Sequence, residues 1–138
     1  MKIHHLGYAV RAISEGVDAF RALGYEPVSG VTEDTSRFVS ICFLRNGDLI
    51  VELVAPNGDD SPVQKKLLGG IGAPYHVCYE VEDLERSILE LAQNGFVLFD
   101  PPLAAPALGG CRVAFLFNKI IGVIELFEKK GETDGLGK

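Results

Sequence analysis

Hydrophobic and polar positions alternate along short stretches of the chain, and two helical patterns interrupt them. The alternation and the short apolar runs predict strands in the first half at residues 2–10, 25–31, 38–44 and 48–55. A helix is expected from Ser14, whose hydroxyl is suited to an N-cap, to about Leu23, because apolar residues recur there at helical spacing. The first half therefore predicts the order β-α-β-β-β.

The second half of the chain repeats this order. Asp83 is expected to cap a second helix, which Gly95 ends. Strands are predicted at residues 75–81, 96–100, 112–117 and 121–128. We therefore predict one domain over residues 1–130, made of modules 2–55 and 75–128 with a connector 56–74, followed by a flexible tail 131–138.

A sequence motif and its spacing indicate that the two modules are copies of one unit. Both His5–Val10 and His76–Val81 have the form H-x-x-Y-x-V. A glycine that ends the helix follows 19 residues after each histidine. A glutamate within an apolar run follows 47 residues after His5 and 49 residues after His76. Internal repetition of this kind determines the architecture, and here it also gives two histidines and two glutamates at matching positions.

The two glutamates, Glu52 and Glu125, are expected to lie on the sheet face that does not pack on a helix. Side chains alternate across a strand, so Val51 and Leu53 point to one side and Glu52 to the other. Burying a lone carboxylate costs several kcal/mol even after relaxation, so each glutamate requires a partner or a cation. By the same alternation, Tyr8 is expected to pack on a helix.

The four matched residues, His5, Glu52, His76 and Glu125, form a candidate metal site. Two neutral imidazoles and two carboxylates suit a divalent ion such as Ni, Co, Zn, Fe or Mn, whereas Cu(I) prefers thiolates. His4 is the competing histidine in the first strand, but it is out of phase with the repeat.

Composition and charge restrict the class of protein. The chain has 138 residues, 47% of them hydrophobic, and a net charge of −6. This hydrophobic content allows a packed core, and the negative charge argues against nucleic acid as a partner. No apolar run approaches the ~20 residues of a membrane span, and the first residues show no signal-peptide pattern. The three cysteines lack metal-finger spacing and suit a reducing compartment, so we expect a cytoplasmic protein without a membrane partner.

Four stretches of the chain resemble the vicinal oxygen chelate superfamily. They read I-H-H-L-G-Y-A-V, I-V-E-L-V-A-P, Y-H-V-C-Y-E-V and G-V-I-E-L-F-E, and they span the chain to about residue 128. The resemblance implies an α+β fold in which paired βαβββ modules form a cupped mixed sheet around one divalent ion. Carried over by position, the metal ligands are His5, Glu52, His76 and Glu125, with Ni or Co favoured, and a homodimer is expected.

Two branches of the superfamily fit the sequence. The runs V-E-L-V-A-P-N-G-D-D-S-P-V and P-Y-H-V-C-Y-E-V-E-D-L resemble the short bacterial form of glyoxalase I (lactoylglutathione lyase). Methylmalonyl-CoA epimerase shares the D-S-P segment and the pair Gly109-Gly110. Some epimerases, however, have a glutamate base in the strand where this chain has Ser40.

The main expectation is therefore a glyoxalase I-like lyase that serves methylglyoxal detoxification. Such an enzyme isomerises the hemithioacetal of methylglyoxal and a thiol to an S-2-hydroxyacyl thioester through an enediolate. The alternatives are methylmalonyl-CoA epimerase, with an acyl-CoA substrate, and a non-catalytic protein that binds a metal or ligand on the same scaffold.

The resemblance also assigns roles to individual residues. Glu125 is preferred as the base that moves the proton, with Glu52 as the second carboxylate. Arg11, Arg37 and Arg112 are candidates for binding the anionic groups of the substrate. The apolar stretch 101–110 is expected to be a loop that acts as a lid, a dimer contact or a plain connector.

Overall fold

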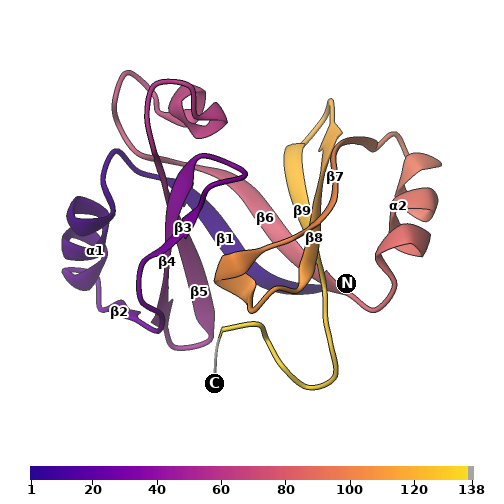
Figure 1. Ribbon diagram of the computed structural model, residues 1–138, viewed down its shortest axis with the longest axis horizontal. Helices are drawn as coiled ribbons and strands as arrows, with labels where there is room; N and C mark the ends of the chain where they lie inside the picture. Colours follow the sequence, from indigo (N-terminus) through magenta and orange to yellow (C-terminus); the bar gives the residue numbers. More distant parts are fainter. Residues whose placement is uncertain (137–138) are drawn as a thin grey trace. The chain divides into compact units, whose positions relative to one another are not determined.

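Two βαβββ units make up the protein (Figure 1), and the computed structural model describes residues 1–136. Residues 5–75 form the N-terminal unit, and residues 1–4 together with the chain from His76 onward form the C-terminal unit. Each unit contains one helix and one group of paired strands, as the repeated pattern predicts. The prediction of an α+β fold built from paired βαβββ modules is confirmed.

The N-terminal unit arranges its strands in the order β2-β4-β5-β1, with β3 also paired to β4. The first strand lies parallel to the last one, β5, and the other pairs are antiparallel. A 3₁₀ turn, η1, follows in the connector. The elements are β1 (Lys2–Ala9), α1 (Ile13–Arg21), β2 (Glu26–Pro27), β3 (Thr32–Asp34), β4 (Val39–Asn46), β5 (Leu49–Pro56) and η1 (Pro62–Lys66).

The C-terminal unit has the same arrangement, with the order β6-β9-β8-β7 and its first strand parallel to its last. The strand pairs β7–β8 and β8–β9 are antiparallel. A 3₁₀ turn, η2, lies between β7 and β8. The elements are β6 (Ala73–Val81), α2 (Leu84–Ala92), β7 (Val97–Ala104), η2 (Pro106–Leu108), β8 (Arg112–Asn118) and β9 (Gly122–Glu128).

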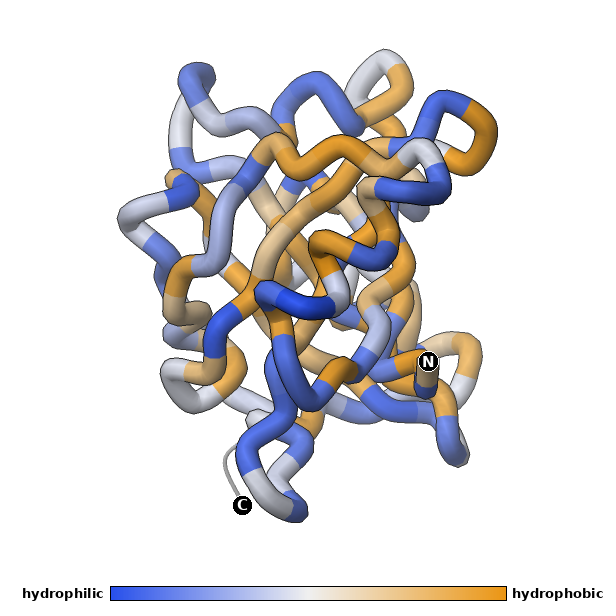
Figure 2. Tube along the Cα trace, turned by 90° about the vertical axis from the view of Figure 1, so that its right-hand side faces the viewer, coloured by the Kyte–Doolittle hydropathy of each residue, from blue (hydrophilic) through white to orange (hydrophobic). Residues whose placement is uncertain are grey.

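Each unit has its own hydrophobic core between its helix and one face of its strands. In the N-terminal unit, Val51 and Leu53 are fully buried, and Tyr8 packs against the same cluster. In the C-terminal unit, Leu126 is buried and Tyr79 packs in the matching place. Hydrophobic residues follow the strands, whereas many turns are hydrophilic (Figure 2). The predicted division of each strand into a helix side and a side that carries the glutamate is therefore confirmed.

The two helices begin in different ways. The Asp83 side chain accepts a hydrogen bond from the backbone N–H of Arg86 at 3.0 Å, so this N-cap is confirmed. The prediction of Ser14 as a cap is wrong, because α1 already begins at Ile13 and Ser14 lies in its first turn. The cap position is Ala12, and within the described residues no side chain caps α1.

Several strand bounds differ from those predicted. The expected strand 25–31 is wrong in extent: β2 has two residues and ends at Pro27, which has no N–H to continue a ladder. The additional strand β3 was not expected. The loop expected at 101–110 is wrong for its first part, because β7 continues to Ala104. A two-residue hairpin turn at Gly47-Asp48 joins β4 to β5, and Gly47 has the positive φ of 59° that such a turn needs.

The end of the chain contacts the C-terminal unit as far as it is described. Leu136 is 7% exposed, and the carbonyl of Asp134 accepts a hydrogen bond from Nε2 of His4 at 2.6 Å. The flexible tail was expected from residue 131, and its last two residues, 137–138, lie outside the described residues. Within residues 1–136, none of the helices is long and apolar enough to cross a membrane.

Candidate metal centre

In the N-terminal unit, His5 and Glu52 form a buried pair. Strand β1 lies parallel to β5 with Gly7 opposite Glu52, so the alternation along β1 brings His5 to the same face as Glu52. The distance from His5 Nε2 to Glu52 Oε1 is 3.4 Å. His5 is fully buried and Glu52 is 5% exposed. The ring of Phe43, which is paired with Glu52 across the β-ladder, meets the His5 ring edge-on at 5.3 Å.

The C-terminal unit contains the same arrangement. Glu125 on β9 lies opposite Cys78 on β6, which places it on the face of His76. Oε1 of Glu125 lies 3.2 Å from Nε2 of His76, and both residues are 3% exposed. Phe115 is paired with Glu125, and its ring meets the His76 ring edge-on at 5.4 Å. Each unit therefore holds a histidine, a glutamate and a phenylalanine in matching positions.

The chemistry of these donors fits a divalent ion. Each pair offers an imidazole nitrogen and a carboxylate oxygen, which are ligands that first-row divalent ions accept. All four side chains belong to candidate ligand groups. A carboxylate buried to this extent is costly without a counter-charge, and a cation supplies one. The coarser prediction, of histidine and glutamate groups suited to a metal, is confirmed in each unit.

His4 has a different environment. Besides its hydrogen bond to Asp134, its ring packs against Phe127 with a centroid separation of 4.8 Å. Its hydrogen bond and ring contact fix the side chain in the C-terminal unit. This agrees with the expectation that His4 is out of phase with the repeat.

Arg37 lies near the glutamate-bearing face of its unit. Its Nη1 donates to Oδ2 of Asp34 at 2.8 Å. Asp34 is opposite Val39 on β4, and alternation along β4 places Val39 on the same face as Phe43. Burial raises the pKa of Asp34, but hydrogen bonds from Ser36 and Arg37 outweigh this effect and hold the pKa below its ordinary value.

Arg112 lies on the opposite, helix side of the C-terminal unit. It alternates with Val113, which faces the same way as Phe115 and Glu125. Its guanidinium donates to Glu85 at 2.8 Å and to Glu128 at 2.9 Å. These hydrogen bonds raise the pKa of Arg112 further above its ordinary value. The structure therefore does not bring Arg112 to the face of Glu125.

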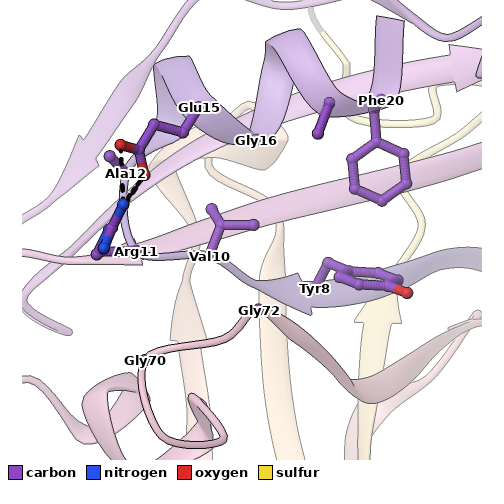
Figure 3. Close-up of a pocket in the computed structure, with 10 residues that line it drawn as sticks. Tyr8, Val10, Arg11, Ala12, Glu15, Gly16, Phe20, Gly70 and Gly72 are labelled. Carbon is purple, nitrogen blue, oxygen red and sulfur yellow. Dashed lines mark hydrogen bonds and ion pairs between the residues drawn. The ribbon is translucent and has the colours of Figure 1, made fainter. Parts of the chain in front are cut away.

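Arg11 borders a cleft of about 310 Å³ in the N-terminal unit (Figure 3). The floor includes Tyr8 and Phe20, which belong to the helix-side core. Arg11 is bound to Glu15 by hydrogen bonds of 3.1 Å at the edge of the cleft. Because Tyr8 points to the opposite side of β1 from His5, this cleft lies on the other face from the His5–Glu52 pair.

The aromatic partners of the histidines were missed from the sequence, because the strand register depends on where the hairpin turn falls. The turn lies at Gly47-Asp48, and counting back from the Asn46–Leu49 pair places Phe43 opposite Glu52. Ser40, the position that distinguishes some epimerases, is half-buried and donates to Oδ1 of Asn57 at 2.8 Å.

The paired βαβββ units define a class of α+β protein, and their buried histidine and glutamate pairs could hold a metal ion. The profile of the Glyoxalase/Bleomycin resistance protein/Dioxygenase superfamily matches residues 4–115. The chain belongs to this superfamily, also called the vicinal oxygen chelate superfamily, as the resemblance implied.

Two curated relatives are epimerases. The mitochondrial methylmalonyl-CoA epimerase of Dictyostelium discoideum is 29% identical over 136 residues, which cover 93% of this chain and 78% of the relative. The ethylmalonyl-CoA/methylmalonyl-CoA epimerase of Cereibacter sphaeroides is 31% identical over 99 residues, covering 68% of this chain and 71% of the relative.

Solved structures agree on the fold. A hypothetical protein from Bacillus halodurans C-125 has a TM-score of 0.82 at 28% identity and covers 96% of both chains. A methylmalonyl-CoA epimerase in complex with methylmalonyl-CoA and NH4+ has a TM-score of 0.79 at 23% identity, covering 94% of this chain and 95% of the other. At that identity, the second likeness supports the fold alone.

These relatives correct the predicted activity. The expectation of a lactoylglutathione lyase acting on a thiol adduct in methylglyoxal detoxification is wrong, because the curated relatives are epimerases. The physical reason is that the matched motifs contain the candidate metal ligands and the strands that carry them. These residues do not indicate which groups contact the substrate.

Proposed function

We propose that this protein is an acyl-CoA epimerase that acts on methylmalonyl-CoA or a related 2-alkylmalonyl thioester. The observation that carries the proposal is the pair of matched His–Glu units, His5–Glu52 and His76–Glu125, in a chain related to epimerases. The Cereibacter sphaeroides relative, named for ethylmalonyl-CoA and methylmalonyl-CoA, favours a substrate with a small alkyl group on the carbon between two carbonyl groups.

The proposed metal ligands are His5, Glu52, His76 and Glu125, acting together on one divalent ion. Their support is the repeat, the burial of all four side chains and the donor chemistry of each pair. A bound divalent ion supplies Lewis-acid stabilisation of negative charge that develops on the carbonyl oxygens of the substrate.

The proposed chemistry moves one proton at C2 of the malonyl group. The C2–H bond breaks on one face of the substrate, its electron pair passes into the adjacent carbonyl groups, and a proton returns to C2 on the opposite face. This inversion needs an acceptor and a donor of protons, and each unit contributes one carboxylate. Glu125 is the proposed base, and Glu52 the proposed second group.

Arg37 is the proposed partner of the free carboxylate of the substrate. Its ion-pair partner Asp34 lies on the glutamate-bearing face, and a guanidinium binds a carboxylate with two parallel hydrogen bonds. Arg112 is held on the helix side by two glutamates, and Arg11 is bound to Glu15 beside the cleft. These contacts favour Arg37 over the other two arginines for this role.

A metal-exchange assay tests the proposed function. The protein is treated with a chelator, reloaded with Co, Ni, Mn, Zn or Fe, and incubated with methylmalonyl-CoA in deuterated water. We expect metal-dependent exchange of the C2 proton together with inversion, as followed by NMR and chiral analysis. Exchange absent with every metal would contradict the proposal. A parallel incubation with methylglyoxal and glutathione is expected to give no metal-dependent loss of hemithioacetal.

A further inference from the structure

An exposed apolar surface lies on the face of the C-terminal unit that carries Glu125. We call it the Phe99 wall, and it consists of Val97, Phe99, Leu103 and Phe117. Their exposed fractions are 63% for Val97, 56% for Phe99, 45% for Leu103 and 46% for Phe117. Several exposed apolar side chains on one face often mark a binding surface.

The strand register places these side chains on that face. Phe115 is opposite Glu125, so alternation along β8 gives Val113 and Phe117 the same direction. Val97 is opposite Phe117, and Leu103 is opposite Val113. Directly paired residues point to the same side of a sheet, so the wall and Glu125 share one face.

Aromatic contacts connect the wall to the candidate metal ligand. The Phe99 ring lies 6.2 Å from the Phe115 ring, which in turn meets His76 edge-on at 5.4 Å. Phe99 is two strands away from Glu125, or about 10 Å between backbones at the usual strand spacing. This distance is comparable to the length of a small acyl group with its thioester, so one substrate could contact both Glu125 and the wall.

Strand β7 is irregular at this point. Its pairing with β8 shifts between Leu98 and Asp100, and again between Asp100 and Leu103. The first shift leaves both Phe99 and Asp100 opposite Phe115, as in a β-bulge. Bulges redirect side chains and are frequent beside active sites. Here the bulge lies in the part of β7 that carries Phe99.

The corresponding positions of the N-terminal unit are polar. Phe43 matches Phe115, because each lies opposite the glutamate of its unit, so Arg45 on β4 matches Phe117 on β8. Glu26, which is opposite Arg45, matches Val97, and Thr32, which is opposite Ile41, matches Leu103. The exposed apolar surface is thus a property of the C-terminal unit and not a general consequence of the fold.

We infer that the Phe99 wall binds the apolar part of the acyl-CoA substrate, namely the alkyl group on C2 and the adjoining thioester end of the pantetheine arm. The inference rests on the proposed function and names a specificity surface for it. A wall of apolar side chains suits these neutral groups and not the free carboxylate or the phosphates, which require polar or charged partners. We favour a substrate group over another protein as the occupant, because the wall lies on the same face as His76 and Glu125.

A tryptophan reporter tests the inference, because the chain has no tryptophan. Phe99→Trp keeps an aromatic ring in the wall, and Leu89→Trp is the control on the exposed side of α2, where Leu89 is 69% exposed. The probe is butyryl-CoA, which has no free carboxylate and does not epimerise. We expect a saturable blue shift of Trp emission in Phe99→Trp only, and about a tenfold weaker calorimetric Kd for Phe99→Ala.

Three results would overturn the inference in distinguishable ways. If the wild type binds butyryl-CoA by calorimetry but Phe99→Trp emission does not change, the wall is not the contact surface and the proposed function stands. If neither butyryl-CoA nor methylmalonyl-CoA binds the metal-loaded wild type, the proposed function fails as well. If Phe99→Trp emission shifts with protein concentration in the absence of ligand, a second copy of the chain covers the wall instead.

Discussion

The two units carry the same histidine, glutamate and phenylalanine arrangement but differ in what surrounds it. The His–Glu distances, 3.4 Å and 3.2 Å, and the edge-on phenylalanine contacts are nearly equal in the two units. Toward the strand edge, the N-terminal unit has the buried Asp34–Arg37 ion pair, and the C-terminal unit has the exposed Phe99 wall. The repeated part has donors suited to a metal ion, and the unequal part supplies the residues that we propose contact the substrate.

The helices show a second contrast between the units. The N-terminus of α2 is held by Asp83 and by Glu128, whose carboxylate accepts from the backbone N–H of Leu84 at 3.0 Å. The N-terminus of α1 borders the cleft at Ala12. The two units therefore share the histidine, glutamate and phenylalanine of the candidate metal centre and differ elsewhere, so a variant in one unit has a matched position in the other.

The largest expected effect comes from the two glutamates. Glu125→Gln and Glu52→Gln should each slow epimerisation by about 100-fold to 10,000-fold, because an amide cannot accept the proton. Steady-state turnover and metal content by elemental analysis are measured together. Glu80→Gln, a half-buried carboxylate without a counterpart in the repeat, is the matched control and should retain turnover. Near-native rates in both glutamine variants would contradict the proposed roles.

The two histidines should behave alike. His5→Ala and His76→Ala are each expected to weaken binding of the divalent ion by roughly 100-fold or more, because each removes a buried ligand, and even a supporting residue around a metal contributes 10-fold to 100-fold. Competition with a chromogenic chelator measures the affinity. His4→Ala is the control and should leave the metal stoichiometry unchanged. A large effect at one histidine and none at the other would contradict the proposal that both histidines bind the ion.

Substitutions of Arg37 and Arg112, which lie on opposite faces of their sheets, should differ in their effect on KM. Arg37→Ala is expected to raise KM for methylmalonyl-CoA by about tenfold with a smaller change in kcat, because a carboxylate contact of this kind contributes on the order of 1.5–3 kcal/mol. Arg112→Ala should leave KM unchanged and lower the midpoint of thermal unfolding. Equal KM effects for both variants would mean that the sheet face does not determine which arginine binds substrate.

Asp34 should give the stability a pH dependence. Its folded-state pKa lies below the ordinary value of 3.8, so its contribution is present above that pH and is lost as the pH falls through the folded-state pKa. Asp34→Asn should therefore be less stable than the wild type at pH 7, by about 1–3 kcal/mol, with a smaller difference near pH 3. Urea unfolding at both pH values measures this, and a difference independent of pH would exclude the ion pair as its cause.

The smallest expected effect is on the unfolding free energy, from substitutions at the N-termini of the two helices. Asp83→Ala should cost about 0.5–2 kcal/mol of unfolding free energy, because a backbone N–H loses its cap. Ser14→Ala should cost nearly nothing, since Ser14 lies inside the first turn of α1. Thermal unfolding of the two variants makes the comparison, and equal losses would show that both serve as caps.

The repeat in the sequence was sufficient to predict the order of the helices and strands apart from β3, and the face on which Glu52 and Glu125 lie. Strand alternation is a strict geometric rule, so a buried Leu53 on one side fixes Glu52 on the other. The start of α1 was harder to predict, because Ser14 is a favourable cap by residue type but lies two residues after the cap position, Ala12.

The substrate class was not predictable from the same motifs. His5, Glu52, His76 and Glu125 are the candidate metal ligands, and they indicate donor chemistry for a divalent ion without indicating the substrate. The features that separate substrates, such as the bulge at Phe99 and the ion pair of Arg37, depend on strand register and on contacts between distant residues. Short local patterns do not contain this information.

The parallel pairing of the first and last strands has a consequence for the synthesis of the protein. In each unit, the histidine is on the first strand and the glutamate on the last, 47 and 49 residues later. A nascent chain that has emerged only as far as β8 already carries both histidines and Glu52, but it lacks Glu125. The complete set of proposed ligands exists only after β9 has been made, so tight capture of the ion would mark a finished chain and not a partial one.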